Sequence, residues 1–293
     1  MTKKLRIFVL LCAFLGLAPS IVWAEQTPVK ISTSYNNDSD GVSYISYSIA
    51  TEKKNKPWNF SYSNTSIRQR DFTARLTEQR FITRWQKRIN EENSFSAWMG
   101  YVDSNVWQFV PFGVQYQGVV NTIDQMWLSY AHDSVTTVAA YQNHILSDQL
   151  AWRYRKELDR RLMLDATIRY AKFSDENFRN TFGVSLTKDF SHRFRLGLAY
   201  LYDTSDINKR SVYYLPKGES SLSLVPEYAV PIGEGSLAIR LSQSLLARNK
   251  DGHINRTTFG VRYQLNNLAI DVQCYSDGSY SSQDYSISWN TRW

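Results

Sequence analysis

Apolar and polar residues alternate one by one over strand-length stretches in many parts of the chain. The odd-numbered positions of 258–265 are apolar, and the even-numbered positions are polar or glycine. The even-numbered positions of 162–170 and of 194–202 are apolar in the same way. A period of two places the apolar residues on one face of an extended strand and the polar residues on the other. The pattern predicts a sheet of many strands, each apolar on one face only.

Two architectures produce such strands: a soluble sandwich or barrel with its apolar face inside, and a membrane barrel with its apolar face outside. The composition favours the second, because Trp 9, Tyr 19 and Phe 14 accompany a mean hydropathy of −0.42. Long Arg and small residues on the polar face suit a wet interior, and aromatic residues near strand ends suit interfacial girdles. We predict an all-β fold, a transmembrane antiparallel up-and-down β-barrel, whose closure satisfies every backbone group.

Sixteen strands are predicted, an even number that places both chain ends on one side of the membrane. The segment Val106–Val119 also has strand character, but it contains Pro111 and would make the count odd. We treat it as a loop that could fold inward as a constriction. An ordinary hairpin or an additional strand are the alternatives for this segment, and a barrel of 12 or 14 strands is the alternative for the whole chain. The connections 104–120 and 204–219 then lie outside, and short turns such as 132–134 are periplasmic. The predicted strands are 29–36, 42–51, 57–66, 70–87, 94–103, 121–131, 135–143, 149–157, 161–172, 179–188, 193–203, 220–230, 235–247, 255–264, 268–276 and 282–293.

The first 24 residues have the features of a secretory signal peptide. Basic residues up to Arg6 precede the apolar run 7–18, and cleavage is predicted after Ala24. The run is shorter than the roughly 20 residues that a membrane-spanning helix needs. We predict a signal peptide at 1–24 and an outer-membrane β-barrel at 25–293, which lowers the formal net charge from +7 to +4.

Composition also limits the chemistry of the mature chain. Cys12 lies in the signal peptide and leaves Cys274 as one thiol, and the four histidines have no metal-ligand spacing. We therefore predict neither a metal site nor a cofactor. Export also argues against a nucleic-acid partner.

The last predicted strand places Tyr285, Ile287, Trp289 and Trp293 on one face, with Thr291 as an exception. This pattern resembles the C-terminal assembly signal of bacterial outer-membrane β-barrel proteins. The resemblance implies a Gram-negative outer membrane reached through the periplasm. Outer-membrane lipid, periplasmic chaperones and the barrel-assembly machinery would then be its partners. The alternative is an edge strand that ends in Trp.

Alternation places a set of arginines on the polar, lumen-facing side of the strands. In the lumen they would favour anionic or hydroxyl-rich solutes through charge and bidentate hydrogen bonds. The alternative is that they brace the wall by pairing with Asp165, Asp271 or Glu78. The lumen-lining candidates are Arg153, Arg155, Arg169, Arg195, Arg240 and Arg262.

Tyr213, Tyr214 and Pro216 form a Tyr-Tyr-x-Pro sequence after a polar loop. It resembles the turn in the barrel portions of exopolysaccharide-export outer-membrane proteins and their small barrel relatives. The long helical repeat region of those exporters has no counterpart in this sequence, so the resemblance covers the barrel alone and implies an export-system partner. The alternative is two interfacial girdle tyrosines and a turn-forming proline.

His132 and Ser134 resemble the His-x-Ser pair of outer-membrane phospholipases and lipid A deacylases. The Asn-Gly that commonly follows that serine is replaced by Val135 and Thr136, and the predicted topology places the pair on the periplasmic side.

Together these features predict a non-enzymatic, porin-like channel or conduit for a hydrophilic solute, related to saccharide or polysaccharide export. The second interpretation is a structural or envelope-assembly barrel with a closed lumen, and an outer-leaflet lipid hydrolase is the third.

Overall fold

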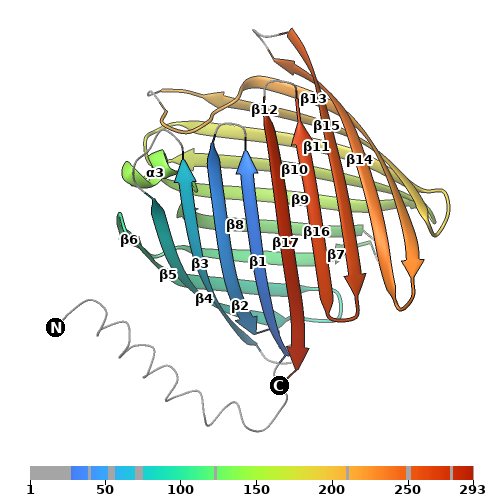
Figure 1. The fold of residues 1–293 in the computed structure, drawn as a ribbon, viewed down its shortest axis with the longest axis horizontal. Coiled ribbons are helices and arrows are strands. Elements are labelled where there is room, and N and C mark those ends of the chain that lie inside the picture. The colour runs from blue at the N-terminus through green and yellow to red at the C-terminus, as the bar shows by residue number, and fades with distance from the viewer. Residues whose placement is uncertain are drawn as a thin grey trace.

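A computed structural model describes residues 28–38, 41–51, 57–69, 75–121, 124–208, 211–248, 252–277 and 280–292. They form one antiparallel sheet that closes on itself, because β1 pairs with both β2 and β17 (Figure 1). The strands are β1 Pro28–Asp38, β2 Val42–Thr51, β3 Trp58–Gln69, β4 Leu76–Arg88, β5 Ser94–Ser104, β6 Gln108–Phe109, β7 Phe112–Val120, β8 Asp124–Ser134, β9 Leu146–Asp159, β10 Leu162–Phe173, β11 Phe178–Asp189, β12 Phe194–Asp206, β13 Lys217–Ile232, β14 Gly235–Arg248, β15 Gly252–Leu265, β16 Leu268–Ser276 and β17 Ser281–Arg292.

The barrel has sixteen strand positions, because β6 and β7 both pair with β5 and together fill one of them. The interruption falls at Pro111, which has no N–H to donate, although its carbonyl still accepts from the Gly100 N–H at 2.8 Å. The prediction that Val106–Val119 is a loop is therefore wrong. Gly113 allows this strand to pass Trp98, since a Cβ there would lie 2.6 Å from the indole ring.

The predicted strand at 135–143 is also wrong. Val138–Gln142 forms the short helix α3, and the Thr137 side chain caps it by accepting from the Ala140 N–H. One strand gained and one lost keep the number at sixteen but reverse the direction of β8. β8 begins at the end of the barrel where β1 starts. Its last residues, 132–134, lie at the opposite end, and not in a turn on the side of the chain termini as predicted. Most other strands lie within a few residues of the prediction, and residues 70–74 of the predicted strand 70–87 lie outside the described residues.

The two ends of the barrel carry different connections. β1 starts and β17 ends at one end, where turns such as 233–234 and 266–267 are short. Gly233 and Asn266 have positive φ of 58° and 45°, which tight hairpin turns require. The opposite end carries long connections, among them 135–145 with α3 and the described segment 211–216 that leads into β13 (Figure 1). We call these two segments the mouth loops, and this end the mouth.

A contact between distant strands identifies the inside of the barrel. Arg80 on β4 donates to Asp133 on β8 at 2.6 and 3.1 Å, although two strand positions separate β4 from β8. Such a contact can form only across the lumen. Strand register then assigns alternate residues all around the barrel to the lumen. The other face carries exposed apolar side chains, including Met99, Leu128, Leu150, Ile168, Leu198 and Phe259.

Charged residues bound the apolar band of this outer face. On β9, Leu150, Trp152 and Tyr154 lie between Asp148 and Lys156. That stretch rises about 26 Å at about 3.3 Å per residue, or about 20 Å across the bilayer at a strand tilt of about 40°. This height approaches the apolar band of about 25 Å that is typical of outer-membrane barrels. No helix among the described residues is long and apolar enough to cross a membrane.

Candidate functional site

The lumen holds an arginine pair on β9. The register places Arg153 and Arg155 on the lumen face, where both donate to Asp165 of β10, at 2.7 and 3.1 Å. Their guanidinium carbons lie 5.1 and 5.8 Å from the centre of the Trp127 ring. Two cations share one carboxylate, so this group carries one excess positive charge. Because the arginines remain partly exposed, that charge faces the water of the lumen.

The other four predicted arginines also fall on the lumen face and divide into two groups. Arg195 pairs with Asp189 at 2.6 Å, and Arg262 pairs with Asp271 at 2.6 Å. These partners lie on neighbouring strands, so the pairs brace the wall locally instead of crossing the lumen. Arg169 and Arg240 are exposed and form no ion pair within the described part of the chain.

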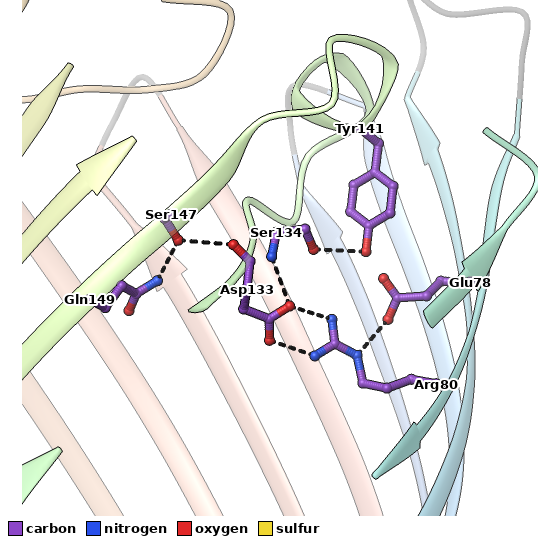
Figure 2. Close-up of polar contacts among 7 residues, drawn as sticks. All are labelled: Glu78, Arg80, Asp133, Ser134, Tyr141, Ser147 and Gln149. Carbon is purple, nitrogen blue, oxygen red and sulfur yellow. Dashed lines mark hydrogen bonds and ion pairs between the residues drawn. The ribbon is translucent and has the colours of Figure 1, made fainter. Parts of the chain in front are cut away.

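Several lumen arginines were not among the predicted candidates, and Arg80 and Arg179 are two of them. Arg80 joins Asp133 across the lumen and also contacts Glu78 at 3.0 Å (Figure 2). Arg179 pairs with Asp203 of the neighbouring strand at 2.5 Å. The available signal was alternation, because both arginines occupy polar positions of predicted strands. Their partners could not be identified without the register.

The wall on the other side of the lumen is lined by hydroxyl groups. Ser32 and Ser48 are 2.6 Å apart, Ser46 and Thr65 are 3.0 Å apart, and Ser34 contacts the Tyr44 hydroxyl at 2.8 Å. We call this region the hydroxyl wall, and it lies half a turn of the barrel from β10 and β11. It consists of Ser286 and Ser288 of β17, Ser32 and Ser34 of β1, Ser46 and Ser48 of β2, and Ser61, Ser63 and Thr65 of β3. The arginine wall consists of Trp127, Arg153, Arg155, Asp165, Arg169, Arg179 and Arg195.

The first mouth loop folds into the lumen. Val138 and Tyr141 of α3 are buried against lumen-facing apolar residues of β3 to β6. In Figure 2 the Tyr141 ring points from the helix toward Glu78 and Arg80, and Ser134 donates to its hydroxyl at 3.0 Å. The inward loop is thus 135–145, not the predicted 104–120. The wall residues of this cluster are Ile67, Leu76, Val102 and Phe109.

The second mouth loop packs against the first. Leu215 shares a buried cluster with Ala140, Ile145 and Phe173. Tyr213 packs on Phe173 and donates to Asp175 at 2.8 Å. Burial, together with this hydrogen bond, raises the pKa of Tyr213, so its hydroxyl stays protonated as a donor. The two loops and β10 therefore form one apolar cover that reaches from the β3–β6 wall toward β13.

The Tyr-Tyr-x-Pro sequence lies in this cover. Pro216 is fully buried, and Tyr213 is held by the contacts just described. Tyr214 is exposed and hydrogen-bonds to Glu219 at the start of β13. The three residues thus form part of the mouth, and Tyr213 contacts another mouth connection instead of lipid.

The last strand is not an edge strand. β17 pairs with β16 on one side and with β1 on the other. Tyr285, Ile287 and Trp289 lie exposed on the outer face, and their role as an assembly signal stays a prediction. Trp293 lies outside the described residues.

His132 and Ser134 do not form a catalytic pair within the described residues. The His132 Nδ1 atom contacts Asp148 at 2.8 Å, whereas the Ser134 hydroxyl donates to Tyr141. Both lie at the mouth end of β8, whereas the prediction placed them at the same end as the chain termini. Among the described residues there is also no cluster of three or more His, Cys, Asp or Glu side chains for a metal.

Comparisons with known proteins give a likeness of fold. No family model matches the chain, and no curated protein matches its sequence. A solved structure described as a bacterial polysaccharide outer membrane secretin has a TM-score of 0.72 at 11% identity, over 92% of this chain and 99% of that chain. OccK3 (OpdO) of Pseudomonas aeruginosa has a TM-score of 0.56 at 9% identity, over 96% of this chain and 99% of that chain. OpdQ of the same organism has a TM-score of 0.53 at 9% identity, over 92% of this chain and 100% of that chain. The chain therefore has the fold of a bacterial outer-membrane β-barrel, with sixteen antiparallel strands.

Proposed function

We propose that the protein is an outer-membrane channel for a hydrophilic solute, and that its arginine wall favours anionic groups on that solute. The observation that carries this proposal is the Arg153–Arg155 pair, whose two charges share Asp165 on the lumen face. A surplus guanidinium can bind a carboxylate, sulfate or phosphate of a passing solute through paired N–H groups. The proposed activity is passage, without a catalytic step.

A saccharide is the solute class that suits both walls. The hydroxyl wall presents groups that both donate and accept, so sugar hydroxyls can exchange hydrogen bonds along it. The arginine wall adds charge recognition for an acidic sugar. The likeness to a polysaccharide secretin and the Tyr-Tyr-x-Pro resemblance support an export role with an export-system partner.

A second candidate function is a structural or envelope-assembly barrel with a closed lumen. The apolar cover over the mouth favours it, because the buried Val138 and Tyr141 fix the first mouth loop against the wall. In the channel proposal, the same cover limits flow and leaves a path beside α3.

Single-channel recording of the refolded mature chain in a planar bilayer separates the two functions. The channel proposal predicts steady openings and a reversal potential in a salt gradient that favours anions. Acidic oligosaccharides should interrupt the current more often than neutral ones of equal length. A silent bilayer, with protein that shows heat-modifiable migration, would support the closed barrel.

The proposal includes export after removal of residues 1–24 and insertion from the periplasm by the barrel-assembly machinery. The mouth then faces outward, since longer loops of such barrels are extracellular. In a Cys274→Ser background, Gly252→Cys should react with an impermeant maleimide on intact cells, and Asn267→Cys should not. The reverse labelling would overturn this orientation.

A further inference from the structure

A row of three polar side chains, flanked by two phenylalanines, crosses the outer face of the barrel below the mouth. Strand register aligns one residue from each of five neighbouring strands, β7 to β11, in the order Phe112, His132, Asp148, Lys172 and Phe178. All five lie on the lipid-facing side, in line with the exposed Leu128, Leu150 and Ile168 below them. We call these five residues the rim row.

Asp148, at the centre of the rim row, lies at the boundary of the apolar band, which corresponds to the height of lipid headgroups. The row immediately below contains Tyr130, Leu150 and Tyr170, and the apolar band continues to Lys156 at the other boundary. Aromatic residues mark membrane interfaces, and charged side chains on the lipid face are tolerated only near them. Because the mouth end of such barrels is extracellular, the rim row lies in the outer leaflet.

The side chains of the rim row are held in place by their neighbours. His132 stacks on Phe112 with ring centres 5.1 Å apart, and Lys172 lies 5.9 Å from the Phe178 ring. Asp148 accepts from the Tyr130 hydroxyl at 2.6 Å and contacts the His132 Nδ1 atom at 2.8 Å. An ionised carboxylate only accepts, so Nδ1 carries the proton and Nε2 faces away from Asp148.

Two groups of the rim row keep unused bonding capacity. Within the described residues, Lys172 interacts electrostatically with Asp148 across the strands but forms no ion pair within 4.0 Å, and His132 Nε2 has no hydrogen-bond partner. His132 and Lys172 lie two strands apart, about 10 Å between backbones at about 4.8 Å per strand. Both side chains can therefore reach one oxyanion placed over Asp148. Asp148 itself is occupied by Tyr130 and His132, which lowers its repulsion of an anion.

We propose that the rim row binds the phosphate of a lipid headgroup in the outer leaflet. Lys172 supplies the charge, His132 in its protonated form donates through Nε2, and Asp148 orients the imidazole. The acyl chains of the lipid would lie along Leu150, Tyr170 and Ile168 below. The site lies outside the lumen, so it does not depend on whether the channel is open.

A matched control exists on the same face of the barrel. Lys188 of β11 lies 5.3 Å from the Phe190 ring, which repeats the Lys172–Phe178 arrangement at the opposite membrane boundary. Replacing Lys188 removes the same charge from the same kind of contact. It leaves the rim row intact.

Native mass spectrometry of the refolded mature chain in detergent tests the proposal, with lipid A, dephosphorylated lipid A and phosphatidylglycerol as probes. We expect Lys172→Gln to weaken lipid A binding about tenfold, the effect of losing one charge-assisted hydrogen bond. His132→Gln should weaken it as well, whereas Lys172→Arg and Lys188→Gln should leave it unchanged. Heat-modifiable migration checks folding, and Lys172→Gln preserves the His132–Asp148 contact if His132→Gln fails to fold.

The probes also separate the sources of the phosphate. Tighter binding of lipid A than of phosphatidylglycerol assigns the site to a phosphorylated glycolipid, and equal binding assigns it to phosphate headgroups in general. Either result supports the proposal. Equal binding of dephosphorylated lipid A would overturn it, and so would unchanged binding in folded Lys172→Gln protein.

Discussion

The two walls of the lumen are built from different side chains and face each other across the barrel. The hydroxyl wall has short, neutral side chains that hydrogen-bond in cross-strand pairs such as Ser32–Ser48. The arginine wall has long charged side chains stacked near Trp127, with Arg153 and Arg155 sharing Asp165. Short side chains leave space for water and solute, whereas long charged ones reach into that space. If the protein is the channel proposed above, one wall would set the width of the lumen and the other its selectivity.

Shortening the first mouth loop, which carries α3, is the change with the largest expected effect. The Val135 N–H donates to the Ile145 carbonyl at 3.2 Å, so a short Asn-Gly turn can replace residues 137–143 between paired ends. We expect conductance to rise about threefold, because a sixteen-stranded barrel without an inward loop has an aqueous lumen. Single-channel recording measures the change. Unchanged conductance in folded protein would mean that the cover does not limit flow.

The mouth also shows what could be predicted from the sequence. Alternation predicted the barrel and most strands, because each strand is apolar on one face. It failed at Pro111, where a barrel strand tolerates a proline by using only its carbonyl, and at 135–143, where Thr137 caps a helix. The β-branched and aromatic residues of 135–143 favour a strand by composition, although Val138 and Tyr141, three residues apart, share a face only in a helix. Their packing against Ile67 and Leu76, which are distant in sequence, holds that helix against the wall.

The candidate site was predictable in part for a similar reason. The alternation of polar and apolar residues alone places Arg153, Arg155 and Arg262 on the lumen face. Alternation does not show that Arg262 pairs one-to-one with Asp271 while Arg153 and Arg155 share Asp165. That pairing depends on the register between neighbouring strands. Arg80 and Asp133 are still harder to pair, since their strands are not neighbours.

Removal of the arginine pair should have the second largest effect. Arg153→Gln with Arg155→Gln changes the local charge from one positive to one negative, because Asp165 remains. We expect the anion-to-cation permeability ratio to fall about fivefold, since charged rings control selectivity in such pores. Reversal potentials in a salt gradient measure this ratio. The matched control is Arg262→Gln, which opens a one-to-one pair and should shift the ratio less; an equal shift would contradict a special role for the pair.

Replacement of the shared carboxylate should act in the opposite direction. Asp165→Asn leaves both guanidinium groups uncompensated, so we expect the anion preference to rise about twofold, less than the pair variant lowers it. The same reversal-potential measurement applies. Asp148→Asn is the control, because it removes a carboxylate from the lipid-facing side and should leave the ratio unchanged. A fall in anion preference for Asp165→Asn would refute the assignment of selectivity to this group.

The smallest effect is expected on the hydroxyl wall. Ser32→Ala breaks the 2.6 Å contact with Ser48, and lumen water can take the place of the lost partner. We expect the free energy of unfolding to fall by less than about 1 kcal/mol, and the double variant with Ser48→Ala to recover part of that loss, because no hydroxyl is then left unpaired. Urea titration measures the stability, and the reversal potential should match that of the wild type. Ser32→Ala removes a neutral hydroxyl and changes no charge in the lumen. A selectivity shift as large as that of the arginine pair would therefore contradict the assignment of selectivity to the arginine wall alone.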